Sequence, residues 1–274
     1  MAQERAEDAG PAMERLMPGV GIRWRGSWPG ERSIRGGPTG RRHKRLIIMI
    51  AALFDIDGTL YSRPMGRGFI EYARRDGRWL RALMYYGLLM PKYSLNKLGI
   101  ISEESLYWSA IGRMPWLIRG YDLLQAARAF DWVASSFILP SGVRPVLERW
   151  EQHRQLGHLL LIVSSGLTPC VERIGAHLGA AGVVGTDVEE RDGRISGRLA
   201  SPVAIGREKA RRATELVSKL GIDVDWRASY AYADSIHDLP VLELVGHPVA
   251  VQPGRELELI ARERGWEAIQ LRGG

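Results

Sequence analysis

Short apolar runs alternate with longer stretches of helical periodicity along most of the chain. Each run is four to nine residues long, as is typical of central parallel strands buried on both faces. The runs occupy residues 46–54, 159–163, 228–233 and 248–251. The helical stretches occupy residues 143–156, 168–179, 206–220, 238–245 and 254–264. This alternation predicts an α/β fold with a doubly wound parallel sheet, in which ligands bind at the carboxyl ends of the strands.

Two segments interrupt the alternation. Residues 61–139 lack a convincing buried strand and hold 14 of the 22 aromatic residues, which predicts a helical cap inserted after the first strand. The expected breaks between its helices lie near Pro91, Gly99 and Pro115. The second interruption, 186–199, contains an Asp-Gly pair typical of a hairpin turn. We therefore expect a catalytic core made of 46–60 and 140–274, with a small β-hairpin insertion.

The composition is that of an ordinary soluble protein, with 45% apolar and 25% charged residues in a chain of 274. Such a chain can bury a large core, and wholesale disorder or collagen-like repeats are excluded. Cys170 is the single cysteine, so no internal disulfide can form. No cluster of cysteines and histidines has zinc-site spacing. We therefore expect a cytoplasmic protein in reducing surroundings.

The formal charge of +7 is unevenly distributed. Residues 1–45 carry ten basic and five acidic residues, with eight glycines and four prolines, and show no helical or strand period. They are predicted to form a flexible basic tail, and a translation start at Met49 is kept as an alternative. The apolar run that follows is too short to span a bilayer, and no small-x-small cleavage site follows it. We therefore expect no signal peptide.

Two aspartates follow the first apolar run. Asp55 and Asp57 are separated by one residue at the predicted end of a strand and are followed by Gly58. Because side chains alternate along a strand, both can reach one site only if the chain leaves the strand there, which a glycine permits. A bare pair of aspartates would favour an acidic turn. The longer sequence Asp-Ile-Asp-Gly-Thr-Leu favours an active site.

A cluster of small residues and a lysine come next. Ser164, Ser165 and Gly166 end the second predicted strand and precede a helix, whose free amides can bind an anion. Helix capping is the alternative role for these serines. Lys209 lies in the first turn of a later helix, where a solvated lysine is the alternative.

A second acid pair follows the third strand. Asp234 and Asp238 are four residues apart across a turn, a spacing that lets them converge on one cation or one lysine. Mg²⁺ prefers oxygen ligands and binds through a few carboxylates and water. His237 lies between the two, and an oxygen site predicts that it is not a metal ligand.

The order of these four motifs resembles that of the haloacid dehalogenase-like (HAD) phosphohydrolase superfamily. The similarity is greatest to subfamily IB, the phosphoserine phosphatase-like branch, and covers about residues 46–270. It includes Pro140-Ser141-Gly142-Val143, the 186–199 hairpin, and the ending Gly246-x-Pro248-x-Ala250-Val251-x-Pro253 followed by Gly265-Trp266. The resemblance implies a HAD-like Rossmannoid core with a C1-type cap.

The resemblance also implies a phosphoaspartyl mechanism. Asp55 would be the nucleophile, and Asp57 would protonate the leaving oxygen and then activate water. Mg²⁺ would be held by Asp55, Asp234 and the backbone carbonyl of Asp57. Ser164, Ser165, Gly166 and Lys209 would bind the phosphate, and Lys209 would also stabilise the developing charge. Asp238 would orient Lys209 or a metal-bound water. Asp57 favours phosphoryl transfer, because the dehalogenase branch lacks this acid.

The cap bears on the substrate. In this family, true phosphoserine phosphatases carry an acidic residue near the start of the cap. Here Pro64 stands nine residues after Asp55, and the nearest acid in the cap is Glu71. Phosphoserine phosphatases also usually have serine where this chain has Gly58. Both differences count against phosphoserine without excluding it.

One helical face of the cap is apolar. Trp79, Leu83, Tyr86 and Met90 recur at helical spacing within a basic, aromatic segment, and we expect them to pack inside the cap. The alternative is a basic amphipathic helix that contacts anionic lipid, or a pocket for a lipid-like phosphate ester. The cap as a whole carries eleven basic and six acidic residues, which would attract anionic substrates.

Several functions remain open. We expect a Mg²⁺-dependent phosphomonoester hydrolase that acts on a small organic phosphate. The alternatives within that class are a true phosphoserine phosphatase and a lipid-phosphate phosphatase at the membrane surface. A non-catalytic module that docks on membranes or nucleic acid is the alternative of a different class. All four motifs are intact, with Asp55 and Asp57 retained together, which argues against it, and no nucleic-acid partner is expected. The oligomeric state is left open.

Overall fold

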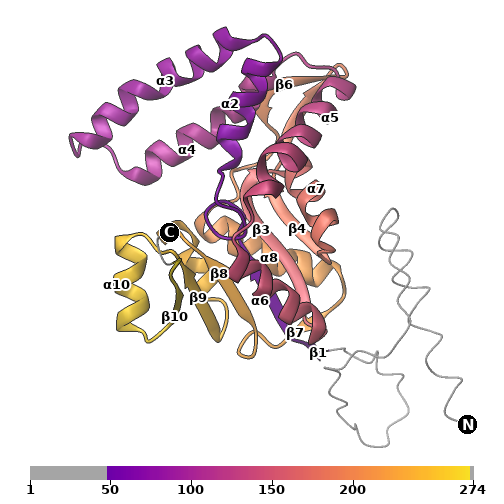
Figure 1. Ribbon diagram of the computed structural model, residues 1–274, viewed down its shortest axis with the longest axis vertical. Coiled ribbons are helices and arrows are strands. Elements are labelled where there is room, and N and C mark those ends of the chain that lie inside the picture. Colours follow the sequence, from indigo (N-terminus) through magenta and orange to yellow (C-terminus); the bar gives the residue numbers. More distant parts are fainter. Residues whose placement is uncertain (1–47, 272–274) are drawn as a thin grey trace, which may run out of the picture.

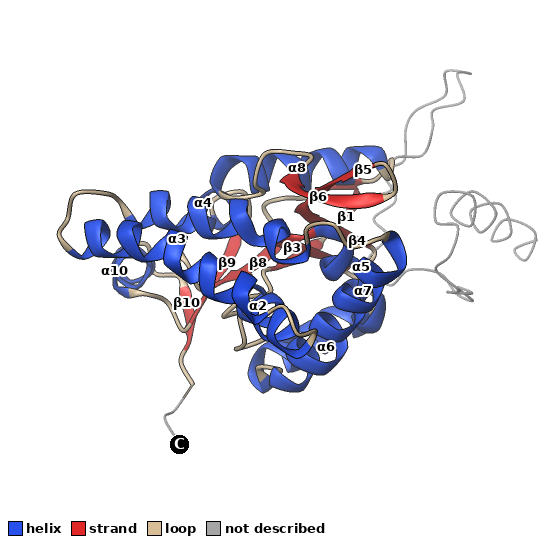
Figure 2. Ribbon diagram, turned by 90° about the horizontal axis from the view of Figure 1, so that it is seen from above, coloured by secondary structure: helices blue, strands red, loops and turns tan. Residues whose placement is uncertain are grey.

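The computed structural model describes residues 48–271, so the predicted tail at 1–45 lies outside the described residues. A six-stranded parallel sheet forms the centre, in the order β10-β9-β8-β2-β3-β4 (Figures 1 and 2). Its strands are β2 (Ala51–Phe54), β3 (Leu159–Leu167), β4 (Gly182–Thr186), β8 (Tyr230–Ala233), β9 (His247–Val251) and β10 (Glu267–Ile269). The predicted doubly wound parallel sheet is confirmed.

The helices of the core cover both faces of the sheet. Alternate residues of β2 face opposite ways: Ala52 and Phe54 pack towards α6 and α7, and Ala51 and Leu53 pack towards α8, α9 and α10. This two-sided burial explains why the strand sequence is continuously apolar. The helices are α6 (Arg144–Gln155), α7 (Thr168–Leu178), α8 (Gly206–Lys219), α9 (Leu239–Leu242) and α10 (Arg255–Glu263).

The first apolar run is divided between two sheets. β1 (Ile48–Met49) pairs in parallel with β7 (Asp223–Val224), and only the following residues enter the central sheet as β2. The Asp-Gly pair closes the predicted hairpin of β5 (Val188–Arg191) and β6 (Arg194–Leu199). Both turn residues have positive φ, 51° for Asp192 and 69° for Gly193, as this turn type requires. Backbone hydrogen bonds join Ile195 in the hairpin to Gly120 and Tyr121 in the cap.

The cap is helical, as expected, and is inserted between β2 and α6. Its elements are α2 (Met65–Arg75), α3 (Trp79–Lys97), α4 (Glu103–Arg113), η1 (Met114–Ile118), α5 (Leu123–Trp132), η2 (Val133–Ile138) and η3 (Leu139–Ser141). The segments that enter and leave the cap lie side by side, because the Val143 amide donates to the Leu60 carbonyl and the Ser62 amide donates to the Ser141 carbonyl. The cap therefore joins the core through a paired stem.

Two expectations about the cap are wrong. α3 does not break at Pro91 but continues through it. Pro91 has no amide hydrogen to donate to the carbonyl of Gly87. Both residues are exposed, so water can hydrogen-bond to that carbonyl instead. Nor do Trp79, Leu83, Tyr86 and Met90 pack inside the cap, since all four are exposed. The packed face of α3 instead carries Ala82 and Tyr85.

No helix within residues 48–271 is long and apolar enough to cross a membrane.

Candidate active site

The loop after β2 brings the first acid pair to the carboxyl edge of the sheet. Asp55 continues the strand, since its amide donates to the Tyr232 carbonyl at 3.0 Å. The chain then leaves the strand at Gly58, which has a φ of +83°. A Cβ atom on Gly58 would lie 2.2 Å from Oδ2 of Asp234. A glycine is therefore required here both by the backbone conformation and by the close approach of Asp234.

Asp57 points towards the start of the cap. Its Oδ2 accepts a hydrogen bond of 3.0 Å from the Met65 amide in the first turn of α2. Its Oδ1 is buried and has no hydrogen-bond partner within the described part of the chain. Burial, together with the negative charge of Asp55, raises the pKa of Asp57 to about 7. A carboxyl group with this pKa can both release and accept a proton near neutral pH.

Lys209 is buried among carboxylates at the start of α8. Its Nζ donates to Oδ1 of Asp55 and to Oδ1 of Asp238, both at 2.6 Å. Burial opposes the charged form, but the charges of Asp238 and Asp55 outweigh it and hold the pKa of Lys209 above its usual range. Lys209 therefore stays charged, and the role of a solvated lysine is excluded because its side chain is only 2% exposed.

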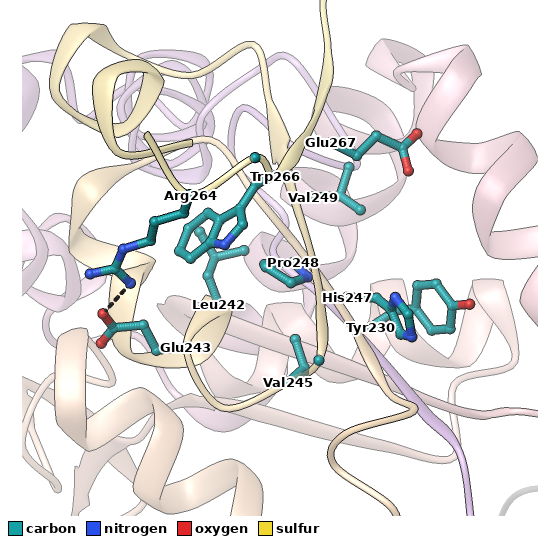
Figure 3. A pocket seen from close by; sticks show the side chains of 12 residues that line it. Tyr230, Leu242, Glu243, Val245, His247, Pro248, Val249, Arg264, Trp266 and Glu267 are labelled. Atoms are coloured by element: carbon teal, nitrogen blue, oxygen red, sulfur yellow. Dashed lines mark hydrogen bonds and ion pairs between the residues drawn. The ribbon is translucent and has the colours of Figure 1, made fainter. Parts of the chain in front are cut away.

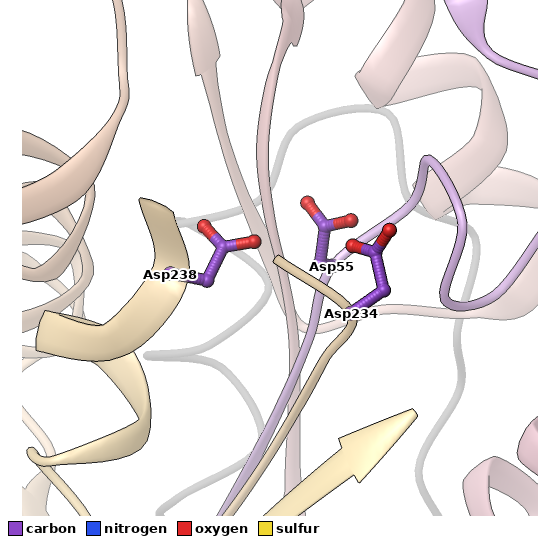
Figure 4. A group of neighbouring side chains, drawn as sticks. All are labelled: Asp55, Asp234 and Asp238. Atoms are coloured by element: carbon purple, nitrogen blue, oxygen red, sulfur yellow. The ribbon is translucent and has the colours of Figure 1, made fainter. Parts of the chain in front are cut away.

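The carboxylates of three aspartates lie close together beside this lysine. Figure 4 shows Asp55, Asp234 and Asp238 pointing into a shared space, and one oxygen from each lies within 4.8 Å of the others. Burial and the neighbouring carboxylates raise the pKa of Asp234 to about 8. Burial also raises the pKa of Asp55, to about 6, although Lys209 opposes this. A hard divalent cation would relieve this crowding of negative charge, and the all-oxygen donor set fits Mg²⁺.

The small residues near the carboxyl end of β3 lie where its pairing with β4 is irregular, between Val163 and Leu167, and we call them the serine turn. Ser164 and Ser165 are almost fully buried. Oγ of Ser164 accepts a hydrogen bond of 3.0 Å from the Gly166 amide. Gly166 packs beneath the cap, because a Cβ atom there would lie 2.6 Å from Sδ of Met65. The predicted phosphate-binding residues thus lie where the core meets the cap.

Tyr107 of α4 is a residue of the site that the sequence analysis missed. Its hydroxyl lies 3.0 Å from Oγ of Ser165, and its ring stacks on His237 with centroids 5.1 Å apart. Burial, reinforced by the charges of Asp57 and Asp55, raises the pKa of the Tyr107 phenol. Tyr107 therefore connects the cap with both the serine turn and the second acid pair. No local pattern marks it, because its role depends on how the cap folds over the core.

A surface hollow lies away from the acid pairs. A hollow of about 590 Å³ is lined by residues at the amino ends of β9 and β10, among them His247, Pro248 and Trp266 (Figure 3). An ion pair of 2.6 Å between Arg264 and Glu243 closes one side. The acid pairs lie at the opposite, carboxyl ends of the strands, which is where ligands bind in open α/β sheets.

Comparisons with known proteins agree with this architecture. The family profile described as haloacid dehalogenase-like hydrolase matches residues 52–243. A protein of Mycobacterium tuberculosis H37Rv named phosphoserine phosphatase SerB1 is 28% identical over 236 residues, which cover 84% of this chain and 74% of that protein. A protein of Streptomyces azureus named inhibition of morphological differentiation protein is 36% identical over 156 residues, covering 57% of this chain and 55% of that protein.

Two solved structures support the same fold. A protein of unknown function from Bordetella pertussis superposes with a TM-score of 0.70 at 27% identity. The superposition covers 82% of this chain and 100% of the Bordetella chain. A phosphoserine phosphatase solved as an analogue of its phospho-aspartyl intermediate has a TM-score of 0.56 at 16% identity, covering 82% of this chain and 95% of that chain. The predicted superfamily and the assignment as a hydrolase are confirmed. This chain belongs to the haloacid dehalogenase-like hydrolase family.

Proposed function

We propose that the protein is a Mg²⁺-dependent phosphomonoester hydrolase that works through a phosphoaspartyl intermediate. The observation that carries this proposal is the pairing of a buried acidic cluster with a charged lysine. Asp55 shares Lys209 with Asp238 and lies within 4.8 Å, oxygen to oxygen, of Asp234. Such a cluster is costly to bury unless it binds a cation and an anionic substrate.

Asp55 is the proposed nucleophile. One of its carboxylate oxygens forms a bond to phosphorus while the bond between phosphorus and the leaving oxygen breaks. Lys209, whose Nζ lies 2.6 Å from Oδ1 of Asp55, orients the carboxylate and stabilises negative charge on the phosphoryl group. Asp238 holds Lys209 in place from the other side, also at 2.6 Å.

Asp57 is the proposed acid and base. It gives a proton to the leaving oxygen in the first step, and in the second step takes a proton from the water that attacks phosphorus and frees Asp55. Its hydrogen bond from the Met65 amide supports this role, since it fixes Oδ2 and leaves Oδ1 for the reacting atoms. Its raised pKa also suits proton transfer in both directions.

The remaining residues would bind the phosphate and the metal. The hydroxyl of Ser164, the amides of Ser165 and Gly166, and Lys209 are the proposed phosphate ligands. The carboxylates of Asp55 and Asp234 and the backbone carbonyl of Asp57 are the proposed metal ligands. When bound, the cation reduces the repulsion between the nucleophilic carboxylate and the phosphate dianion.

A small organic phosphate remains the proposed substrate. The relative SerB1 is named a phosphoserine phosphatase, which keeps phosphoserine as an alternative. Pro64 stands where the phosphoserine enzymes carry their acid near the start of the cap, and here it precedes the first turn of α2. A cytoplasmic setting remains part of the proposal, because Cys170 is a buried free thiol.

Hydrolysis of p-nitrophenyl phosphate tests the proposal. We expect turnover with Mg²⁺ and loss of turnover when the cation is chelated. Asp55→Asn should abolish turnover at nearly unchanged melting temperature, because the amide is isosteric but a poor nucleophile. Asp225→Asn, an exposed change outside the site, is the matched control and should keep full activity. Full activity of Asp55→Asn, or activity independent of divalent cations, would contradict the proposal.

A further inference from the structure

The outer surface of α3 is apolar on almost every side. Only Ala82 and Tyr85 are buried in this helix of 19 residues. Large apolar side chains elsewhere on it are exposed by 37% to 59%. They are Trp79, Leu80, Leu83, Met84, Tyr86, Leu88, Met90, Tyr93 and Leu95. Leu98 and Ile100, just beyond the helix, are 72% and 65% exposed.

A surface helix of a soluble protein normally carries polar side chains on its solvent side. Along α3 they are scarce, and helical spacing of three and four residues places the exposed apolar side chains next to one another on a surface that we call the α3 face. Contiguous apolar patches of this kind mark surfaces that bind a partner or a membrane. The three aromatic residues of the α3 face combine apolar rings with polar atoms, as side chains at a membrane interface do.

The charge around the α3 face is positive. Between residues 74 and 97 the chain has six basic residues and one acidic residue, and α3 itself has three basic and none acidic. The basic residues are Arg74, Arg75, Arg78, Arg81, Lys92 and Lys97. Basic residues beside exposed apolar side chains are typical of helices that lie on anionic lipid surfaces.

The α3 face belongs to an arm that projects from the cap. In Figures 1 and 2, α3 and α4 run side by side away from the end of α2, above the core. The hydroxyl of Tyr85 donates to the Ala110 carbonyl at 2.8 Å and ties the two helices together. On the other side of the arm, Tyr107 of α4 contacts Ser165 in the candidate active site. The arm thus presents its apolar side outwards and its catalytic side inwards.

We propose that the α3 face docks on the surface of an anionic lipid bilayer. The helix would lie in the interface with its apolar side chains among the acyl chains and the exposed basic residues Arg74, Arg75 and Lys97 at the anionic headgroups. A second copy of this chain fits the face less well, because self-association would bring two positively charged surfaces together without acidic residues on α3 to pair with them. Docking depends on neither the metal nor the phosphatase activity.

Co-sedimentation with vesicles tests the docking. The full chain is mixed with vesicles of phosphatidylcholine alone or of phosphatidylcholine with phosphatidylglycerol. The test variant is Leu83→Glu with Met90→Glu, at two positions that are 59% and 53% exposed. The control is Leu156→Glu with Leu259→Glu, which are 56% and 58% exposed and lie in the core domain. Both variants change the charge equally and disturb no buried side chain.

We expect the wild type and the control to bind the anionic vesicles and to be released by salt. The test variant should bind at least about tenfold more weakly, because it loses two apolar side chains that would enter the bilayer and gains two charges that the anionic headgroups repel. Its turnover of p-nitrophenyl phosphate should equal that of the wild type.

Three results would overturn the proposal. The first is that the wild type stays in the supernatant with anionic vesicles. The second is equal binding of the test variant and the wild type, which would assign the binding to another basic segment such as residues 1–45. The third is a dimer of the wild type that the test variant abolishes while its vesicle binding persists, which would assign the α3 face to a second copy.

Discussion

At the scale of single residues, the two carboxylates of the first loop have different surroundings, which suit the different roles proposed for them. Asp55 contacts Lys209, whereas Asp57 contacts the cap and leaves one buried oxygen unpaired within the described residues. Asp57→Asn should lower turnover by about 100-fold to 10,000-fold, because general acid and base catalysis is lost. With p-nitrophenyl phosphate, whose leaving group needs no proton, rapid-quench measurements should still show one phosphorylation per site.

Asp55→Asn provides the comparison for that experiment. It should show neither turnover nor phosphorylation, because the nucleophile itself is missing. If Asp57→Asn also fails to become phosphorylated, or if it turns over as fast as the wild type, the proposed division of roles is wrong.

Gly58 allows a second test at residue scale. Gly58→Ala should raise the Mg²⁺ concentration needed for half-maximal activity several-fold, because its Cβ atom would displace Asp234, whose Oδ2 lies 2.2 Å away. Gly179→Ala is the matched control, since Gly179 also has positive φ but no neighbour within 4 Å of a Cβ atom. Both variants should lose about 1–2 kcal/mol of stability from backbone strain. A shift in Mg²⁺ dependence in both, or in neither, would contradict the role of Gly58.

Residues in short ordered motifs could be found from the sequence, whereas contacts made across domains could not. Asp55, Lys209 and Asp238 each follow a strand or open a helix, and the structure brings them into direct contact. Tyr107 has no such position, and its place beside Ser165 arises only when α4 packs over the core. Local patterns encode which edge of a sheet a residue occupies, but not which cap residue closes over it.

At the scale of elements, helical period alone did not decide which face of α3 is buried. The face chosen from the sequence contains the largest apolar residues, but the packed face contains Ala82 and Tyr85. Small residues let two helices approach closely, so the closest contact favours alanine over tryptophan or leucine. A helix that is apolar nearly all round has no unique buried face in its sequence.

Strand β4 shows a similar limit. Its sequence Gly-Val-Val-Gly-Thr predicts a strand only weakly, because glycine lowers β-propensity. In the structure, a Cβ atom on Gly185 would lie 2.7 Å from Cα of Thr168, so glycine allows the start of α7 to approach the sheet. The residue that weakens the sequence signal is thus required by the packing.

Helix α4 contacts the site through Tyr107, in addition to the contacts that Met65 of α2 makes with Asp57 and Gly166. Tyr107→Phe removes one hydrogen bond to Ser165 and should raise KM by about 2-fold to 10-fold, the usual net value of one hydrogen bond, with a smaller change in kcat. Tyr93→Phe, at an exposed position of α3, is the control and should leave both constants unchanged. Unchanged KM in Tyr107→Phe would show that the hydroxyl does not position the serine turn.

At the scale of the whole molecule, charge is divided by role. The core gathers buried carboxylates that suit a cation, and the cap carries an excess of five basic residues, as residues 1–45 also do. A basic cap above a buried acidic cluster would favour anionic substrates by long-range attraction. The total charge of +7 conceals this division.

A buried histidine couples the stability of the core to pH. His153 of α6 packs against the central sheet. Its Nδ1 forms a hydrogen bond with Nδ1 of His158 and its Nε2 forms one with the hydroxyl of Tyr232, both at 2.8 Å. Burial, with the nearby His158 and Arg149, lowers the pKa of His153 to about 4. In the unfolded chain this pKa returns to about 6.5. Between these two values the unfolded chain binds a proton that the folded protein excludes, so this contribution to stability falls as the pH drops.

The His153→Gln variant tests this linkage. Chemical denaturation at a series of pH values should show that the wild type loses roughly 1–3 kcal/mol more than His153→Gln between pH about 6.5 and about 4, because glutamine cannot titrate. Carboxylates titrate in the same window in both proteins, so their effect cancels in the difference. His177→Gln replaces an exposed histidine of α7 and should follow the wild-type curve. If His153→Gln also follows that curve, His153 is protonated as readily in the folded protein as in the unfolded chain, and its burial imposes no pH limit on the core.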